Sequence, residues 1–278
     1  MAYNETFKDK ICVITGAGSG IGRALALKLN ANGAVLALSD IDAAGLAETV
    51  DLLGANTNRL MHDTLDVANA EAIPVYADKV KAALGNADYV FNVAGVARVG
   101  SFDDSPLSSL ETVMNVNFYG VVRMSKAFLG QLKETRGGLV NISSIFGIIG
   151  FPGQVDYCAS KFAVRGFSET LAQEMESFGV SVSSVHPGGV ATNIARNAVM
   201  DKNPDPTISR EEMDAGFDKA AITSVEKAAD IILNGTAKRK RRILVGSDAK
   251  LVQLITRLFP VTYAKVMRRM KPDMYDIV

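Results

Sequence analysis

The stretch KICVITGAGSGIGRALALKLNANG, residues 10–33, decides the fold. It begins with a short apolar run, passes through a glycine-rich turn at residues 15–22 and ends in a helical pattern. Glycines between a strand and its helix let the backbone approach a pyrophosphate, whose charge then lies at the positive helix N-terminus. The spacing G-x-x-x-G-x-G differs from the common fingerprint G-x-G-x-x-G. Its position directly after the first strand nevertheless indicates a dinucleotide-binding turn.

The alternation of strand and helix continues along the chain. Strands are expected at residues 10–15, 34–40, 59–67, 88–95, 137–144, 180–189 and 242–246, and helices at 43–53, from 105 to about 132, and 154–178. Strands that are apolar throughout rather than alternating, such as that at residues 10–15, are typical of parallel sheets with helices on both faces. We therefore predict an α/β fold, a single doubly wound Rossmann-type domain over residues 1–246 with about seven parallel strands. Residues 247–278 are expected to form a C-terminal helical extension of the same domain.

Composition argues against several classes of protein. The 278 residues include 30 basic and 30 acidic side chains, so no overall field attracts nucleic acid. Two cysteines, Cys12 and Cys158, and two histidines, His62 and His186, show no spacing of a zinc site or a disulfide framework. The first ten residues hold no apolar leader, and no apolar run approaches a bilayer span. We expect a cytoplasmic protein without a bound metal or a nucleic-acid partner.

The end of the second strand indicates which dinucleotide binds. Asp40 follows Gly20 by twenty residues, where a carboxylate can accept hydrogen bonds from the adenosine ribose and repel a 2′-phosphate. Ser19 and Ser39 stand where a cation could bind that phosphate. NAD is therefore favoured over NADP. The alternative is that Asp40 caps the following turn, with Asp42 sharing that role.

Tyr157 and Lys161 lie four residues apart and share one face of an expected helix. A free tyrosine has a pKa of about 10, and a nearby ammonium can lower it by about 1–3. Tyr157 could then accept a proton from an alcohol or return one to a carbonyl. The alternative is an amphipathic helix with a lysine that extends its charge to solvent.

Further motifs follow in order. They are Asp66-Val67 after the third strand, Asn92-Val93-Ala94-Gly95, Asn117-Phe118-Tyr119-Gly120, Ser143-Ser144, and Pro187-Gly188 with Thr192. Together with the glycine turn and the Tyr157–Lys161 pair, these motifs resemble the short-chain dehydrogenase/reductase family across residues 8–246.

The resemblance implies a catalytic tetrad of Asn117, Ser144, Tyr157 and Lys161. Tyr157 would be the acid/base and Ser144 would hydrogen-bond the substrate oxygen, with Ser143 as its supporting neighbour. Lys161 would also bind the nicotinamide ribose, and Asn117 would hold a water that links Lys161 to solvent.

The resemblance also implies the cofactor contacts. The glycine turn would hold the pyrophosphate, Asp66 and Val67 the adenine, and Ala94-Gly95 would pass close to the ribose, while Asn92 would stabilise the strands. Residues 187–192 would fix the carboxamide. In full, the expected contacts are Gly16, Ser19, Gly20, Ile21, Asp40, Asp66, Val67, Asn92, Ala94, Gly95, Tyr157, Lys161, Pro187, Gly188, Val190 and Thr192. His186 is interpreted as a packed strand-end residue rather than a catalytic one.

Two segments are expected to shape the substrate pocket. Residues 145–151 are strongly apolar, and residues 193–222 form a long connection that could act as a lid and carries Met200, Met213 and Phe217. Apolar walls favour a lipophilic alcohol, ketone or aldehyde, although these side chains could instead fill the core or a subunit contact. The basic run at residues 238–242 is interpreted as a solvated turn after a helix rather than a nucleic-acid signal.

Residues 251–270 form an apolar stretch interspersed with basic side chains and broken by Pro260. An amphipathic helix pair here could cover the substrate cleft, pack on another subunit or rest on a membrane surface, and we favour the first role. By analogy with the family we expect a homodimer or homotetramer. An NADP-dependent carbonyl reductase, a non-catalytic dinucleotide-binding protein and a peripheral membrane protein are the alternatives to an NAD-linked oxidoreductase.

Overall fold

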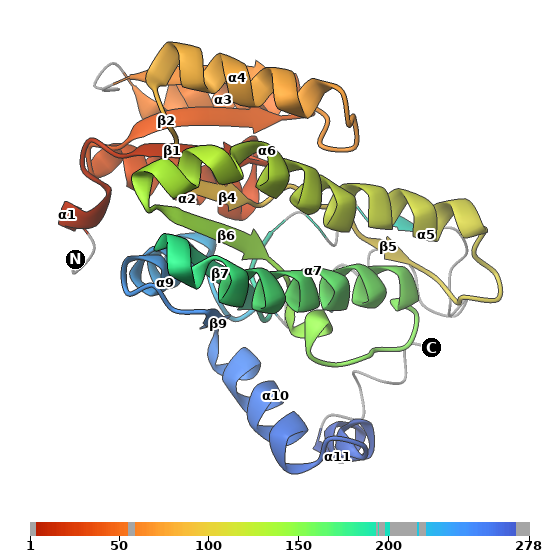
Figure 1. Cartoon of the computed structure of the whole chain (residues 1–278). Coiled ribbons are helices and arrows are strands. Elements are labelled where there is room, and N and C mark those ends of the chain that lie inside the picture. Colours follow the sequence, from red (N-terminus) through yellow and green to blue (C-terminus); the bar gives the residue numbers. More distant parts are fainter. Residues whose placement is uncertain are drawn as a thin grey trace.

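A seven-stranded parallel sheet forms the centre of the molecule in the computed structural model, which describes residues 4–54, 59–192, 194, 198–200, 216 and 221–270 (Figure 1). The strand order is β3-β2-β1-β4-β6-β7-β9, so the predicted doubly wound sheet is confirmed. Its strands are β1 (Ile11–Thr15), β2 (Val35–Asp40), β3 (Leu60–Thr64), β4 (Tyr89–Asn92), β6 (Gly138–Ile142), β7 (Ser181–Pro187) and β9 (Arg242–Val245). The order reverses between β1 and β4, and ligands of such sheets bind at the carboxyl ends of the strands beside that point.

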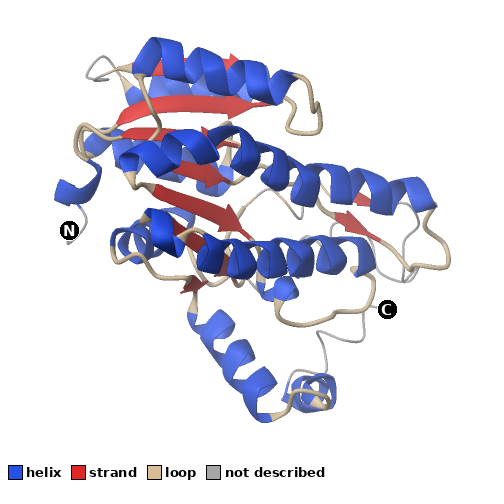
Figure 2. Cartoon of the chain, in the orientation of Figure 1, coloured by secondary structure: helices blue, strands red, loops and turns tan. Residues whose placement is uncertain are grey.

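Helices cover both faces of the sheet (Figure 2). One face packs under α2 (Gly20–Ala31), α3 (Ala43–Leu53) and α9 (Val225–Ala237), and the other under α4 (Ala72–Leu84), α6 (Gly120–Thr135) and α7 (Val155–Glu174). Along β1, Cys12 and Ile14 enter the first core while Ile11 and Val13 enter the second. Because successive side chains point to opposite faces, this two-sided cover explains why the strand is apolar at every position. The short α1 (Asn4–Phe7) precedes the sheet.

The long helix expected from Ser105-Pro106 onward is interrupted. It consists of α5 (Leu107–Met114), the π-helical turn η1 (Asn115–Tyr119) and α6. Pro106 takes the N-cap position, one residue later than expected, with extended backbone at φ −68° and ψ 149°. A π-turn inside a helix commonly marks a functional position, and here it carries Asn117.

The chain continues beyond β9 as α10 (Ser247–Leu258) and α11 (Tyr263–Met270), which project below the sheet in Figure 1. Their inner sides share an apolar cluster with residues of the 145–151 segment, which begins with the short helix η2 (Ile145–Gly147). Within the expected lid, β8 (Val199–Met200) pairs with β5 (Arg98–Val99). Met213 and Phe217 lie outside the described residues.

The basic run at residues 238–242 lies in the turn between α9 and β9. Arg239 donates to the carbonyls of Arg136 and Gly179, Arg241 pairs with Glu176 at the short helix η3 (Glu176–Phe178), and Arg242 pairs with Glu169. Three of its five cations therefore bind groups of the protein itself.

Among the helices that the structure describes, none combines the length and the apolar character needed to cross a bilayer.

The approach of α2 to the glycine turn gives a test of the fold. A Cβ added at Gly22 would lie 1.9 Å from the carbonyl oxygen of Gly16, whereas a Cβ at the helical Gly130 would meet nothing within 4 Å. We expect Gly22→Ala to lower the free energy of unfolding by about 1–3 kcal/mol through overpacking. Gly130→Ala should raise it by about 0.5–1 kcal/mol because alanine is the better helix former. Urea denaturation of both variants measures the difference, and equal stability of the two would contradict the packing described.

Candidate active site

The four residues of the expected tetrad lie at the carboxyl ends of neighbouring strands. Ser144 is the second residue after β6, and Tyr157 and Lys161 occupy the first turns of α7. Asn117 lies in η1, and both η1 and β6 contact α7. The sheet thus brings together residues that are up to 44 positions apart in the sequence, from Asn117 to Lys161.

Tyr157 is the centre of this cluster. Its phenol lies next to the Ser144 side chain, whose influence lowers the Tyr157 pKa in part. The Lys161 Nζ lies 5.4 Å from the centroid of the Tyr157 ring and donates to the Ile142 carbonyl at 3.0 Å. One face of α7 therefore presents a phenol and an ammonium side by side, as the four-residue spacing predicts.

Burial controls the charges of this pair. Desolvation raises the pKa of Tyr157 to about 12, against a smaller lowering effect of the Ser144 hydrogen bond. Desolvation also lowers the pKa of Lys161 to about 8. The expectation that Lys161 brings the Tyr157 pKa below 10 is wrong for this structure. The reason is that burial disfavours both charged forms and that the lysine donates its hydrogen bond to Ile142.

Asn117 joins the strand-end loop to α7. Its Oδ1 accepts from the Val96 amide at 2.8 Å, and its Nδ2 donates to the Val96 carbonyl at 2.9 Å and to the Ser160 hydroxyl at 3.1 Å. Ser160 in turn donates to the Tyr157 carbonyl at 2.8 Å. Both amide protons of Asn117 are thus used within the protein, and its side chain fixes the loop against the helix that carries Tyr157. The water relay through Asn117 stays a prediction.

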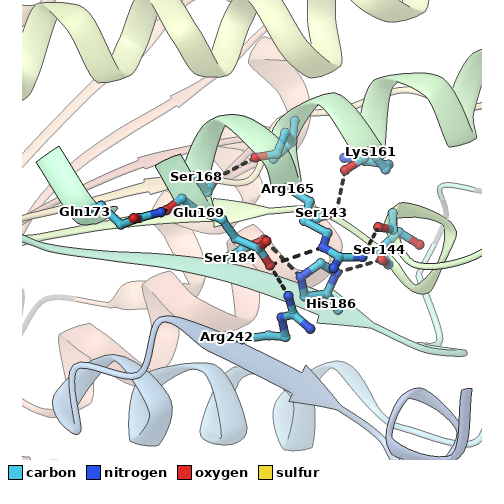
Figure 3. A network of polar contacts seen from close by, with 12 residues as sticks. Ser143, Ser144, Lys161, Arg165, Ser168, Glu169, Gln173, Ser184, His186 and Arg242 are labelled. Carbon is cyan, nitrogen blue, oxygen red and sulfur yellow. Dashed lines mark hydrogen bonds and ion pairs between the residues drawn. The ribbon is translucent and has the colours of Figure 1, made fainter. Parts of the chain in front are cut away.

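A network of polar contacts reaches the backbone carbonyl of Ser144 (Figure 3). Ser143 donates to the Lys161 carbonyl at 2.8 Å. His186 lies between Ser144 and Ser184, with Nδ1 2.9 Å from the Ser144 carbonyl and Nε2 3.0 Å from the Ser184 hydroxyl. Because a carbonyl can only accept, Nδ1 carries the proton and Nε2 accepts from Ser184.

His186 is neutral at physiological pH. Burial lowers its pKa to about 4, Arg242 and Arg165 add to that effect, and the hydrogen bond to Ser144 opposes it. A neutral imidazole that donates to the Ser144 carbonyl holds the end of β6 in place. His186 is fully buried, so it is the packed strand-end residue that the sequence predicts.

The glycine turn lies against the start of the chain after β4. Thr15 accepts from the amides of Val93 and Ala94 at 3.1 and 3.2 Å, and a Cβ at Gly16 would lie 2.7 Å from the Ala94 nitrogen. Ser19, the N-cap of α2, is exposed and makes no capping hydrogen bond with its side chain. Ile21 follows in the first turn of α2 and packs in part against the core.

Asp40 contacts the glycine turn directly. Its carboxylate accepts from the Gly18 amide at 2.7 Å and from the Asp42 amide at 2.9 Å. Asp42 itself caps α3 by accepting from Ala44 at 3.1 Å. Asp40 thus caps the turn that follows it and Asp42 caps α3, as the alternative interpretation expects, while the second Asp40 oxygen binds the glycine turn.

The remaining adenine-side residues occupy three different environments. Asp66 is exposed and accepts from the Ala68 amide at 2.8 Å, whereas Val67 is buried against Gly120. Asn92 donates to Asn141 on β6 at 2.9 Å. Asn92 therefore joins two central strands, in agreement with the expected stabilising role.

The expected carboxamide loop begins at Pro187, the last residue of β7. Val190 pairs with Thr223, and the Thr192 methyl lies 3.4 Å from a Cβ built on Gly20. The loop therefore reaches the N-terminus of α2. Gly95 belongs to the same region, because a Cβ there would lie 3.5 Å from the Lys161 Nζ.

Asp248 is a site residue that the sequence reasoning missed. Its Oδ2 accepts from the Gly189 amide at 2.6 Å, and a Cβ on Gly188 would lie 2.0 Å from the same oxygen. Its Oδ1 is buried without a hydrogen-bond partner among the described residues. The sequence does show Asp248 as an acidic residue in the first turn of the helix after Gly246. Its partner Gly189 lies 59 positions earlier, so no local pattern connects the two residues.

The reversed strand order, the glycine turn beside it and the Ser144–Tyr157–Lys161 cluster together define a Rossmann-type oxidoreductase. The sequence profile of the family described as short chain dehydrogenase matches residues 10–203. The chain belongs to this short-chain dehydrogenase/reductase family, and the resemblance found in the sequence is confirmed.

Relatives support the same assignment. A putative oxidoreductase, SadH, of Mycobacterium tuberculosis is 46% identical over 266 residues, which cover 95% of each chain. The structure of a short-chain dehydrogenase/reductase from Burkholderia phymatum in complex with NAD has a TM-score of 0.82 and 29% identity, and covers 91% of this chain and 94% of that one. A short chain dehydrogenase from Mycobacterium paratuberculosis bound to NAD has a TM-score of 0.75 and 26% identity, over 88% and 99%.

The buried imidazole gives a prediction about pH. The pKa of His186 is about 4 in the folded chain, below the usual value of about 6.5, so acid favours the unfolded state, which binds the proton more readily. Between about pH 7.5 and about pH 5 this linkage should cost roughly 2 kcal/mol of the free energy of unfolding. In His186→Asn, where an amide can still donate to Ser144, the loss over this interval should be smaller by that amount.

Urea denaturation at the two pH values measures how much unfolding free energy is lost between them, in the unchanged protein and in His186→Asn. His62→Asn is the matched control because His62 is exposed. The assignment of a buried neutral His186 would be contradicted if His186→Asn lost as much unfolding free energy as the unchanged protein. It would also be contradicted if His62→Asn reduced this loss as much as His186→Asn does.

Proposed function

We propose that the protein transfers a hydride between NAD(H) and an alcohol or its ketone or aldehyde, with Tyr157 as the acid/base. The observation that carries this proposal is that Tyr157 lies beside Ser144 and a buried Lys161, whose Nζ is 5.4 Å from the centroid of the Tyr157 ring. The NAD complexes of the two similar structures give further support. The non-catalytic dinucleotide-binding alternative is disfavoured because Asn117, Ser144, Tyr157 and Lys161 are all present and lie around one helix.

The residues at the switch point fit a nicotinamide dinucleotide. The first turn of α2 has no side-chain cap, so its amides can donate to a pyrophosphate. Gly16, Gly18, Gly20 and Gly22 leave half of the eight positions of this turn without a side chain. Gly95, Pro187, Gly188, Val190 and Thr192 border the region between α2 and Lys161. When bound, the cofactor supplies the site that accepts or releases the hydride.

NAD is proposed over NADP because of charge at the glycine turn. Asp40 places a carboxylate beside Gly18, where it would repel a 2′-phosphate. Arg23, a cation in the first turn of α2, already donates to the Gly45 carbonyl at 3.1 Å and pairs with Glu48 at 2.7 Å. An NADP-dependent carbonyl reductase is the alternative within the family.

The protein side of the chemistry follows from the charges. With a pKa of about 12, Tyr157 is protonated at neutral pH and can donate its proton to a carbonyl oxygen during reduction. In the oxidation direction the same phenol must first lose its proton, and an ammonium on Lys161 would favour that step. Ser144 would hold the substrate oxygen beside the Tyr157 hydroxyl.

The residues around Tyr157 suggest an apolar substrate. The ring of Phe146 lies 6.1 Å from that of Tyr157 at an interplanar angle of 87°, and Phe151 packs on Phe146 at 5.4 Å. Both phenylalanines are half-buried. Ile148 and Ile149, in contrast, are buried against α10 and α11, so only part of the 145–151 segment is available to a lipophilic alcohol, ketone or aldehyde.

Assembly and location stay proposals by analogy. The exposed Val155 and Phe162 on α7 offer apolar surface for a homodimer or homotetramer. A cytoplasmic location is proposed from the sequence.

Tyr157→Phe tests the function directly. In an NAD-coupled screen of aliphatic, aromatic and steroidal alcohols and ketones, we expect kcat to fall by at least about 100-fold, because the acid/base proton is removed. The affinity of the variant for NAD, measured by titration of the protein with the dinucleotide, should differ little from that of the unchanged protein. Tyr119→Phe makes the same chemical change at an exposed tyrosine and should keep full activity. Turnover of Tyr157→Phe at the rate of the unchanged protein would refute the mechanism.

Asp40→Ser tests the choice of cofactor. Removal of the carboxylate should lower kcat/KM with NAD and raise it with NADP, changing their ratio by at least about tenfold. Steady-state kinetics with both cofactors measure this ratio. Asp42→Ser is the matched control, because it alters the cap of α3 and should leave the ratio unchanged. A preference for NADP in the unchanged protein would contradict the proposal.

A further inference from the structure

The C-terminal helices have two faces, and the protein covers one of them. Val252 and Ile255 of α10 and Met267 of α11 are buried against Ile148 and Ile149. The Tyr263 hydroxyl accepts from the Gly150 amide at 2.9 Å, which fixes the start of α11 to the same segment. This inner face packs on the 145–151 segment, and the covering of a substrate cleft by the extension stays a prediction.

The outer face of α10 is apolar and exposed. Leu251, Leu254 and Leu258 expose 46%, 55% and 64% of their surface. At about 100° per residue, these three leucines lie within an arc of about 60°, next to the arc that holds the buried Ile255 and Val252. Phe259 and Val261 continue the exposed apolar surface past the end of the helix. We call these five residues the leucine face.

Cations surround the leucine face. Lys250 and Arg257 lie beside the leucines on α10, and Lys265, Arg268 and Arg269 are exposed on α11. Residues 249–270 contain these five cations and no aspartate or glutamate, although the whole chain has equal numbers of basic and acidic residues. The extension thus combines an exposed apolar face with a concentrated positive charge.

We propose that the leucine face binds the surface of an anionic phospholipid bilayer, with α10 lying in the interface plane. An amphipathic helix binds such a surface by burying its apolar side chains at the level of the headgroups while its cations contact anionic lipids. Each basic residue near the surface adds to this attraction. At 12 residues, α10 is too short to cross the bilayer.

A second copy of the chain fits this face less well. A two-fold contact through α10 would bring the same surface of both subunits together. Between residues 249 and 270 each copy would contribute five cations and no carboxylate, so like charges would meet across such a contact. Charge complementarity therefore favours an anionic lipid surface over self-association.

Vesicle co-sedimentation of the full chain tests the proposal. Vesicles of phosphatidylcholine alone are compared with vesicles that contain about 30% phosphatidylglycerol, at about 0.1 M and about 0.5 M salt. We expect binding to the anionic vesicles that weakens with salt, and little binding to phosphatidylcholine. In the double variant Leu254→Glu/Leu258→Glu, the fraction bound should fall by at least about tenfold because two apolar anchors are lost.

The matched control is Leu52→Glu/Val75→Glu. These residues expose 55% and 68% of their surface on α3 and α4, and the control adds the same two negative charges far along the sequence from the extension. It should bind anionic vesicles like the unchanged protein, and circular dichroism should show all three proteins folded alike.

Three outcomes would overturn the proposal. The first is an absence of binding to phosphatidylglycerol vesicles, and the second is an equal loss of binding in both double variants. The third is a smaller sedimentation coefficient of Leu254→Glu/Leu258→Glu without lipid, because the leucine face would then be a contact between copies of the chain. None of these readouts depends on the proposed enzymatic activity, so the two proposals fail separately.

Discussion

The buried hydroxyl of Thr15 accepts two hydrogen bonds that join the glycine turn to the chain after β4. The rest of the site is arranged around this junction. Thr15, at the end of β1, accepts from the amides of Val93 and Ala94 as the chain leaves β4. These two strands flank the reversal of strand order, so their ends open the crevice in which ligands of doubly wound sheets bind. The glycine turn can pass this close to Ala94 because Gly16 has no side chain. Every proposed contact of the cofactor and of the substrate is arranged around this junction.

Much of this arrangement could be predicted from the sequence, for a physical reason. A parallel strand that is covered on both faces is apolar at each position, so β1 and β2 stand out as continuous apolar runs. The doubly wound parallel sheet and the shared helix face of Tyr157 and Lys161 then follow from local patterns and from the family resemblance. The π-turn at Asn117 could not be predicted in this way, because it accompanies hydrogen bonds to Val96, which lies 21 positions earlier.

The charges of the site also depend on the folded environment. The sequence places an ammonium near a phenol, which by itself favours the phenolate. The fold adds burial, which raises the pKa of Tyr157 and lowers those of Lys161 and His186. The three groups are therefore biased toward their neutral forms. Such a site is ready to donate a proton, and it needs an added positive charge or a solvent path before it can accept one.

The extension beyond β9 joins both sides of this site. Asp248, in the first turn of α10, holds the Gly189 amide, and Tyr263, at the start of α11, holds the Gly150 amide. The first contact lies in the proposed carboxamide loop and the second in the apolar segment that carries Phe146 beside Tyr157. Asp248 and the leucine face therefore belong to the same helix, α10. That helix packs on the 145–151 segment with one face and is exposed with another.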